Sequence, residues 1–272
     1  MLNIITAFHT EALPLIEKFQ LKKLAKHNVF DTYINDDHST SLTISGLGKL
    51  NASAAVIHSA NLFPESKKQC WVNLGIAGHH TIETGTLIIA NKVIDESSSQ
   101  NWYPQIIFET DIVKVPLTTI DTPTAAYPSE SAVDMEASGF YSTASKVSTC
   151  ELIHCLKIIS DNEKHSFKSL DKQEVKLLIK NKIIQIEDIL HTLKELTVDI
   201  YDSSYDIEIY QTLTAHIHFT HSEKLKLKNM LVKWDVLIPH NPLDTDHCIK
   251  LNYANKILKY LSDETGKQSV KF

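Results

Sequence analysis

The sequence predicts an α/β fold with a central sheet of buried strands and helices packed against it. A continuous apolar run at 2–8 suits a strand that is covered on both faces. Two later apolar runs carry acidic residues at their ends, in V-D-M-E-A-S-G-F-Y at 133–141 and in K-I-I-S-D-N at 157–162. Open α/β sheets bind ligands at the carboxyl ends of their strands. We therefore expect three carboxylates to meet near one rim: Asp134, Glu136 and Asp161.

Apolar spacing and turn residues predict the other elements in order. Apolar residues recur at helical spacing from Leu13 to Leu24, which places Glu11 in the first turn of a helix. Apolar runs on both sides of the polar turn N-D-D-H-S-T predict a hairpin that pairs 29–34 with 41–44. We expect further strands at 70–74, 85–94 and 113–120, and helices at 171–196, 222–237 and 246–261.

Length and composition indicate a globular chain. Its 272 residues allow one large domain or one domain with an appendage, and 43% of them are hydrophobic. No apolar run is long enough to cross a bilayer, and the first residues lack a signal-like pattern. The four cysteines show neither metal spacing nor the density of a disulfide framework. We therefore expect a cytoplasmic protein that does not interact with membranes.

The basic residues restrict the partners of the chain. All 27 of them are lysine, and the formal net charge is -6. Arginine binds phosphate through two parallel hydrogen bonds, whereas lysine offers a mobile point charge. Phosphate therefore loses its usual anchor, although lysine or backbone N–H groups can still bind it. The negative net charge also argues against a nucleic-acid surface.

The expected carboxylates at the rim suit the cleavage of a glycosidic bond. One acid can hold or activate the sugar side while another protonates the leaving group. The same residues also have a structural explanation, with Glu136 satisfying backbone N–H groups at a helix start and Asp161 forming a turn. Glu11 likewise suits the positive end of a helix dipole. The residues alone leave both interpretations open.

Five segments in order resemble the shared core of a known superfamily. They are I-I-T-A-F-H-T-E at 4–11, S-G-L-G-K-L-N-A at 45–52, N-L-G-I-A-G at 73–78, V-D-M-E-A at 133–137 and I-S-D at 159–161. Together they resemble the purine nucleoside phosphorylase and nucleosidase superfamily, with methylthioadenosine/S-adenosylhomocysteine nucleosidase-like proteins closest in pattern. The resemblance implies a three-layer fold with a central mixed sheet over residues 1–196. Residues 197–272 are then an acidic linker and a helical extension of unknown role.

The resemblance also implies roles for individual residues. Glu11 is expected to hold and activate the attacking water. Met135 and Glu136 are expected to hold the ribose, with Glu136 accepting hydrogen bonds from its hydroxyls. Asp161 is expected to protonate purine N7, oriented by Ser160. Gly75, Ile76 and Lys157 complete the expected site, and the family implies a homodimer with no metal and no organic cofactor.

Several positions depart from the family pattern. Ile76 stands where the phosphorylases have a serine of their phosphate site, and their early arginine-bearing loop is replaced by T-A-F-H-T-E. Both departures favour water over phosphate as the nucleophile. Lys157 stands where nucleosidases have an arginine. The connection at 121–131, which supplies base contacts in the nucleosidases, is short here, so it leaves the base unassigned.

Other features allow two interpretations each. Trp102, in an aromatic loop with Tyr103, is expected to cover the base or the 5′ substituent, or else to pack in a dimer interface. The Gly-x-Gly turn at 46–49 either approaches a ligand anion or permits close helix packing. His79 and His80 either line the crevice or are solvated. The H-I-H-F-T-H segment at 216–221 superficially resembles a metal cluster but has no carboxylate or cysteine at ligand spacing.

We therefore predict a nucleosidase that hydrolyses the N-glycosidic bond of a purine nucleoside, with a 5′-modified nucleoside such as methylthioadenosine as one option. The first alternative is a phosphate-dependent phosphorylase. The second is a binding or interaction protein that kept the fold without turnover, with the C-terminal extension as its working part.

Overall fold

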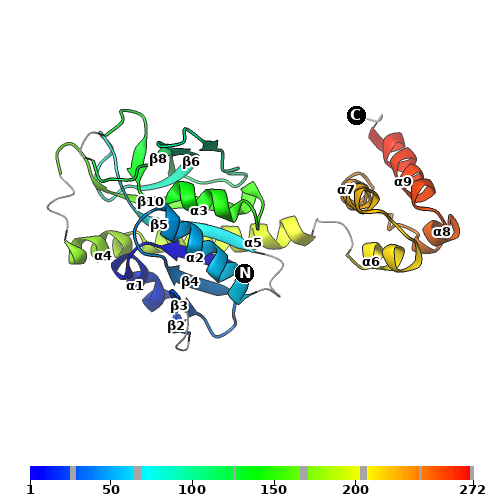
Figure 1. The fold of residues 1–272 in the computed structure, drawn as a ribbon, viewed down its shortest axis with the longest axis horizontal. Coiled ribbons are helices and arrows are strands. Elements are labelled where there is room, and N and C mark those ends of the chain that lie inside the picture. Colours follow the sequence, from blue (N-terminus) through cyan, green and yellow to red (C-terminus); the bar gives the residue numbers. More distant parts are fainter. Residues whose placement is uncertain are drawn as a thin grey trace. The chain divides into compact units, whose positions relative to one another are not determined.

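The computed structural model describes residues 1–24, 29–63, 69–124, 127–165, 171–202, 207–238 and 241–269. The chain divides into two compact units, Met1–Thr197 and Val198–Phe272, which are described separately. Figure 1 shows the α/β architecture of the first unit and the helical architecture of the second. Within the described ranges, no helix combines the length and the apolar character that a membrane span requires.

A mixed sheet forms the centre of the first unit. Its strands are β1 (Leu2–Thr6), β2 (Lys22–Lys23), β3 (Asp31–Ile34), β4 (Thr40–Ile44), β5 (Cys70–Gly78), β6 (Leu87–Asp95), β7 (Asn101–Trp102), β8 (Val113–Thr119), β9 (Ala132–Asp134) and β10 (Ile153–Asp161). The predicted hairpin is confirmed, because β3 and β4 pair antiparallel. β5 continues past the predicted end at residue 74, which brings Gly75 and Gly78 into the strand.

The predicted open sheet is in part closed. β5 pairs with β1, β9 and β10, and β10 also pairs with β6. Since β6 pairs with β8 and β8 with β9, these strands form a ring. The register places Asp161 beside Gly78, which in turn pairs with Val133. The ends of β5, β9 and β10 therefore meet at one place.

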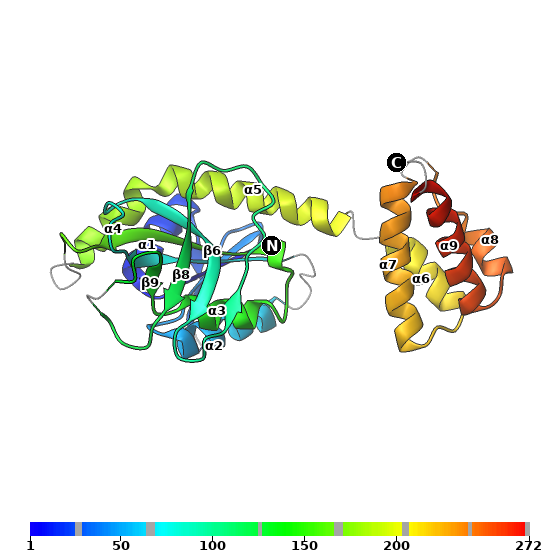
Figure 2. The same cartoon turned by 90° about the horizontal axis from the view of Figure 1, so that it is seen from above.

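Helices cover both sides of the sheet, which makes three layers. α1 (His9–Lys18), α4 (Lys172–Asn181) and α5 (Ile183–Asp202) lie on one side, and α2 (Lys49–Leu62) and α3 (Ala137–Ala144) on the other (Figure 2). α2 and α3 approach closely at Gly139, where a Cβ atom would lie 2.0 Å from the Lys49 carbonyl oxygen. The strands between the layers are buried, and β10 is buried along its whole length.

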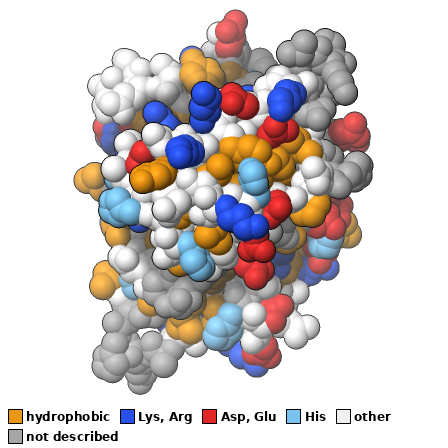
Figure 3. Space-filling view, turned by 90° about the vertical axis from the view of Figure 1, so that its right-hand side faces the viewer, with side chains coloured by type: hydrophobic (Ala, Val, Ile, Leu, Met, Phe, Trp, Pro, Cys, Tyr) orange, Lys and Arg blue, Asp and Glu red, His pale blue; other side chains and the backbone are white. Residues whose placement is uncertain are grey.

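The second unit is a separate helical cluster. It contains α6 (Ile207–His216), α7 (His221–Leu237), α8 (Thr245–Lys250) and α9 (Ala254–Ser269). Its own apolar core includes Leu213, Leu227, Leu231, Trp234, Ile257 and Leu261. Figure 3 shows a face on which lysine and acidic side chains are interspersed with hydrophobic ones, a pattern typical of a solvated surface.

The structure corrects three helix predictions. The helix predicted at 171–196 is two helices that meet at Lys182, the C-cap of α4. The predicted acidic linker is largely helical, because α5 continues to Asp202 and α6 begins at Ile207, while residues 203–206 lie outside the described ranges. The helix predicted at 246–261 is divided into α8 and α9, with Asn252 between them at a φ of 57°. The helix predicted at 222–237 is confirmed as α7.

Candidate active site

The meeting strand ends enclose a cavity in the first unit. Its volume is about 150 Å³. Asp134, Glu136 and Asp161, the carboxylates expected at this rim, line it together with Glu11, so four carboxylates from three separate segments converge as the strand pattern predicts. The lining consists of Ala7, Phe8, Glu11, Leu47, Ile76, Ala77, Gly78, Ile120, Pro123, Thr124, Tyr127, Val133, Asp134, Met135, Glu136, Ser160 and Asp161.

Glu11 is fixed by backbone groups at the end of β1. One carboxylate oxygen accepts the N–H groups of Ala7 and Phe8, both at 2.9 Å. The other accepts the Ile76 N–H at 3.1 Å. Burial raises the pKa of Glu11, although the Lys157 ammonium and these N–H groups oppose the shift. A base with a raised pKa is a stronger proton acceptor, so the position suits activation of a water molecule.

A buried ion pair lies beneath the cavity. The Lys157 ammonium is 2.8 Å from an oxygen of Asp134, and both side chains are almost fully buried. The same Asp134 oxygen accepts the Ala137 N–H at 2.9 Å, and the other oxygen accepts the Thr119 hydroxyl at 2.8 Å. Burial alone would lower the pKa of Lys157, but Asp134, Glu136 and Glu11 outweigh it and raise that pKa. Lys157 is therefore the charged counterpart of the buried acids.

Glu136 stands at the start of α3 and reaches across to the glycine turn before α2. It accepts the Gly48 N–H at 2.8 Å. Burial raises the pKa of Glu136 to about 7, with Asp134 and Glu11 adding to the effect and Lys157 opposing it. The Gly48 N–H, one of the groups that could approach a ligand anion, therefore donates to the Glu136 carboxylate.

Asp161 accepts a side-chain hydroxyl on each of its two carboxylate oxygens. The Ser160 hydroxyl donates to one oxygen, and the Tyr127 hydroxyl donates to the other. Ser160 also lies 3.3 Å from the Ala77 carbonyl oxygen. Burial and the Asp161 carboxylate raise the pKa of Tyr127, so its hydroxyl remains a donor. The sequence prediction included Ser160 but missed Tyr127.

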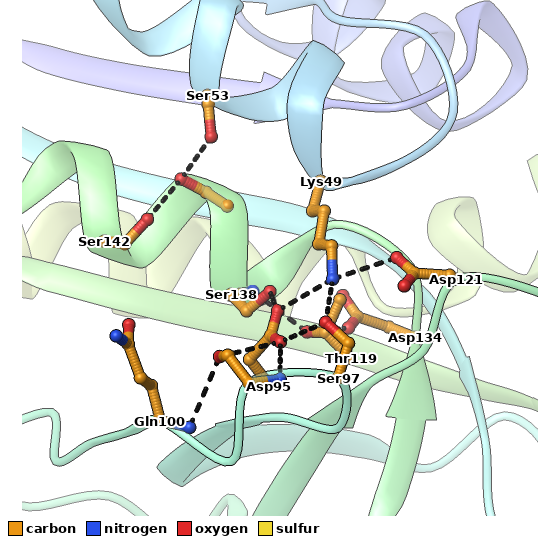
Figure 4. Close-up of polar contacts among 12 residues, drawn as sticks. Lys49, Ser53, Asp95, Ser97, Gln100, Thr119, Asp121, Asp134, Ser138 and Ser142 are labelled. Atoms are coloured by element: carbon orange, nitrogen blue, oxygen red, sulfur yellow. Dashed lines mark hydrogen bonds and ion pairs between the residues drawn. The ribbon is translucent and has the colours of Figure 1, made fainter.

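A second polar network adjoins Asp134 and the start of α3 (Figure 4). Asp95 accepts the Ser138 hydroxyl at 2.7 Å, and the Ser138 N–H donates to the Thr119 hydroxyl at 2.9 Å. Thr119 in turn donates to Asp134. The Lys49 ammonium lies 3.1 Å from Asp95, 2.9 Å from Asp121 and 2.7 Å from the Ser97 hydroxyl oxygen. This network saturates Lys49 with protein acceptors.

The remaining predicted residues fall into two groups. Ile76 and Met135 line the cavity, and Gly75 lies directly beneath it, where a Cβ atom would be 2.8 Å from a Glu11 oxygen. Trp102 does not line the cavity; it pairs in β7 and lies 6.4 Å from the Tyr141 ring, against the sheet core. The structure therefore separates the aromatic loop from the carboxylates.

The predicted histidines also lie elsewhere. His79 is buried and accepts the N–H groups of Thr81 and Ile82, both at 3.1 Å, and His80 lies 3.1 Å from Glu163. Neither lines the carboxylate cavity. Across the described part of the chain, no group of three histidine, cysteine or acidic residues is arranged to hold a metal ion.

Two larger cavities in the first unit lack the strand-end acids. One of about 520 Å³ lies between the starts of β6 and β8 and the junction of α4 with α5. One of about 550 Å³ is lined by polar residues that include His80 and His165. Their size alone does not make either a reaction site, because neither is lined by Glu11, Glu136 or Asp161.

The fold is similar to solved nucleosidase structures. A 5′-methylthioadenosine/S-adenosylhomocysteine nucleosidase from S. pneumoniae, with the transition-state inhibitor MT-ImmA, gives a TM-score of 0.55 at 19% identity over 72% of this chain and 99% of that chain. The 5′-methylthioadenosine nucleosidase of Arabidopsis thaliana in apo form gives 0.56 at 14% identity over 70% and 95%. The Neisseria meningitidis nucleosidase with methylthio-immucillin-A gives 0.53 at 21% over 67% and 96%.

These similarities confirm the predicted three-layer nucleoside phosphorylase-like fold. The fold resemblance that the five segments predicted is therefore confirmed as well. No protein-family model matches the chain, and no curated protein matches it. The residues of the site therefore carry the functional conclusion.

Proposed function

We propose that this chain is a nucleosidase that hydrolyses the N-glycosidic bond of a purine nucleoside. The observation that carries the proposal is the convergence of Glu11, Glu136 and Asp161 on one cavity, with each carboxylate held by named donors. The structurally similar proteins are nucleosidases, two of them bound to methylthio-immucillin-type inhibitors, which supports the same reaction class. A 5′-modified nucleoside, such as a 5′-thio nucleoside, is the substrate that these similarities favour.

The proposed reaction uses one acid at each end of the cavity. Water forms a bond to the sugar carbon C1′ while the bond from C1′ to the base nitrogen N9 breaks, and the bonding electrons pass to the base. Asp161 acts as the general acid that delivers a proton to base nitrogen N7, and Glu11 takes a proton from the water. Glu136 and Met135 hold the ribose, where negative charge stabilises the oxocarbenium character of the transition state.

Four features support water over phosphate as the nucleophile. Lys49 is already bound to Asp95 and Asp121, and the Gly48 N–H is given to Glu136. Ile76 offers no hydroxyl to an anion, and the chain contains no arginine. Phosphorolysis is the alternative, and it requires these groups to exchange partners.

We further propose a homodimer that acts on a small nucleoside in the cytoplasm, without a metal or cofactor, a nucleic-acid partner or a membrane partner. The family resemblance of the sequence supports self-association, and Leu50 on α2 and Tyr103 in the aromatic loop are exposed apolar side chains of the first unit. Analytical ultracentrifugation of the whole chain tests it, and a monomer at all concentrations contradicts it. The division at 196–197 into a nucleosidase domain and an extension of separate role is part of the same proposal.

The test is release of free base and reducing sugar from a panel of purine nucleosides and 5′-thio analogues. We expect release from at least one compound, with the sugar released as a free reducing sugar. No release from any compound by a folded protein contradicts the proposed activity and favours the non-catalytic alternative.

A further inference from the structure

The cavity described above is small for the proposed substrate. Its volume is about 150 Å³, whereas pockets that bind small molecules usually measure about 300–1,000 Å³. One of the residues that line it, Tyr127, comes from the short connection before β9 and not from a strand end. The phenol ring of Tyr127 therefore takes up space that a nucleoside needs.

The ring of Tyr127 lies directly against the strand end that carries the acid. A Cβ atom at Gly78 would be 2.5 Å from Tyr127 Cε1 and 2.7 Å from Asp161 Oδ2. Only a glycine at position 78 leaves room for the aromatic ring and the carboxylate together. The hydroxyl of the same ring donates to Asp161 Oδ2. Tyr127 thus presents a flat ring and a hydroxyl donor to Asp161, whereas a purine base would present a flat ring and, in the proposed reaction, N7 as the acceptor of a proton from Asp161.

We propose that Tyr127 occupies the position of the purine base in the pocket, and that the base displaces the Tyr127 hydroxyl from Asp161 as it binds. This inference rests on the proposed function, because it takes Asp161 as the group that faces the base. The Ser160 hydroxyl, on the other Asp161 oxygen, stays in place and keeps the carboxylate oriented. Tyr127 is therefore a specificity-determining residue: a base binds only if it replaces both the ring contact and the hydrogen bond.

The displacement lowers affinity by the free energy of the bond that is broken. A hydrogen bond to a carboxylate contributes enough for a change of about tenfold or more in a dissociation constant. Tyr127→Phe keeps the ring but removes this competition, so the variant is expected to bind a base more tightly than the wild type. Ser160→Ala is the matched control, since it removes the other hydroxyl from Asp161 but no competitor of the base.

The experiment is titration calorimetry of the full chain with adenine, hypoxanthine and guanine, with thermal unfolding to confirm that each variant folds. We expect the dissociation constant of the best base to fall about tenfold in Tyr127→Phe and not to fall in Ser160→Ala. In a crystal structure with that base, the Tyr127 hydroxyl is expected outside hydrogen-bonding distance of Asp161, with the base in its place.

The outcomes separate this inference from the proposed reaction, because binding does not require turnover. Tighter binding in Tyr127→Phe without hydrolysis of any nucleoside supports the displacement and contradicts the reaction. Hydrolysis by the wild type, with equal or weaker base binding in Tyr127→Phe, overturns the displacement and leaves the reaction standing. If none of the three bases binds either protein, Asp161 does not face a base and the inference is overturned.

Discussion

The two halves of the pocket are built differently. We name the two halves after the proposed function. The ribose half, with Glu11, Asp134, Glu136 and Lys157, is held mainly by backbone N–H groups and a buried ion pair, with one hydroxyl, from Thr119, on Asp134. The base half, with Asp161, Ser160 and Tyr127, is held by hydroxyl groups, one of which comes from the connection before β9. Backbone donors at strand and helix ends have fixed positions, whereas a tyrosine side chain rotates away easily.

This difference suggests a division of tasks. The ribose half is arranged before the substrate binds, as electrostatic stabilisation of a charged transition state requires. The base half rearranges, as we infer for Tyr127, and so decides which base is accepted. Substitutions in the ribose half are therefore expected to affect stability strongly, and those in the base half to affect catalysis and base binding.

The largest expected effect is on catalysis in the base half. Asp161→Asn keeps the shape of the side chain but cannot supply a proton, so kcat for base release is expected to fall about 10²–10⁴-fold. Steady-state kinetics on the best nucleoside, with thermal unfolding as the folding control, measures it. A variant that retains more than about a tenth of wild-type kcat contradicts Asp161 as the general acid.

The next effect is on stability in the ribose half. Lys157→Met leaves Asp134, Glu11 and Glu136 buried without their cation, and the free energy of unfolding is expected to fall by about 3–5 kcal/mol. Urea denaturation measures this change. Lys176→Met is the matched control, because Lys176 makes a surface ion pair with Glu17 at 3.3 Å and is expected to cost less than about 1 kcal/mol. An equal loss of unfolding free energy in the two variants would show that the buried ion pair of Lys157 and Asp134 does not stabilise the site.

A pH effect follows from Glu136, whose pKa is raised to about 7. Only the ionised carboxylate accepts hydrogen bonds from both ribose hydroxyls, so kcat/KM is expected to fall as the pH decreases below about 7. Glu136→Gln is expected to react more slowly and to lose this part of the pH profile, while any dependence from Glu11 remains. An unchanged profile in Glu136→Gln would assign the titration to another group.

The same pKa predicts the sign of a stability change. Between the ordinary glutamate pKa of 4.5 and about 7, the folded state binds more protons at Glu136 than the unfolded state does. The free energy of unfolding therefore decreases as the pH rises through this window. Denaturation of wild type and Glu136→Gln across the window measures the difference, and a contribution from Glu136 that rises with pH would contradict the burial of this carboxyl.

The smallest effects are expected from removing one hydroxyl in each half, that of Thr119 in the ribose half and that of Ser160 in the base half. Thr119→Val removes a donor from Asp134 and an acceptor from the Ser138 N–H, so it is expected to lower the free energy of unfolding by about 1–3 kcal/mol. Ser160→Ala removes one donor from Asp161 and is expected to lower kcat about tenfold with a smaller loss of stability. If Ser160→Ala destabilises more than Thr119→Val, the two halves are not different in the way proposed.

Most strands and helices were predictable from local sequence pattern. The errors concern a helix break and the long-range strand pairing. Apolar runs identified the strands, and the hairpin of β3 and β4 followed from its polar turn. The break at Lys182 was not visible, because apolar residues continue at helical spacing on both sides of it. The pairing of β5 with β10 and β9, which closes the sheet, is a long-range property that no local pattern encodes.

The site was predictable where residues lie at strand ends and not where they lie in connections. Glu11, Glu136 and Asp161 follow buried strands, so topology alone brings them together. Tyr127 belongs to the Pro-rich connection, of which residues 125–126 lie outside the described ranges, and spacing does not show which way its side chain points. The sequence did contain one indication of the backbone at Tyr127, because Pro128 restricts the residue before it to extended conformations. Trp102 was misplaced because an aromatic residue suits a sheet core as well as a base.

The most direct test of the account is the rate of base release as phosphate is varied from none to saturation, with the sugar product identified by mass spectrometry. Hydrolysis predicts full activity without phosphate, no increase on its addition, and a free reducing sugar as the product. Release that requires phosphate and yields a sugar 1-phosphate would contradict it. Lys49 or the 46–49 turn would then have to leave its present partners to bind the anion.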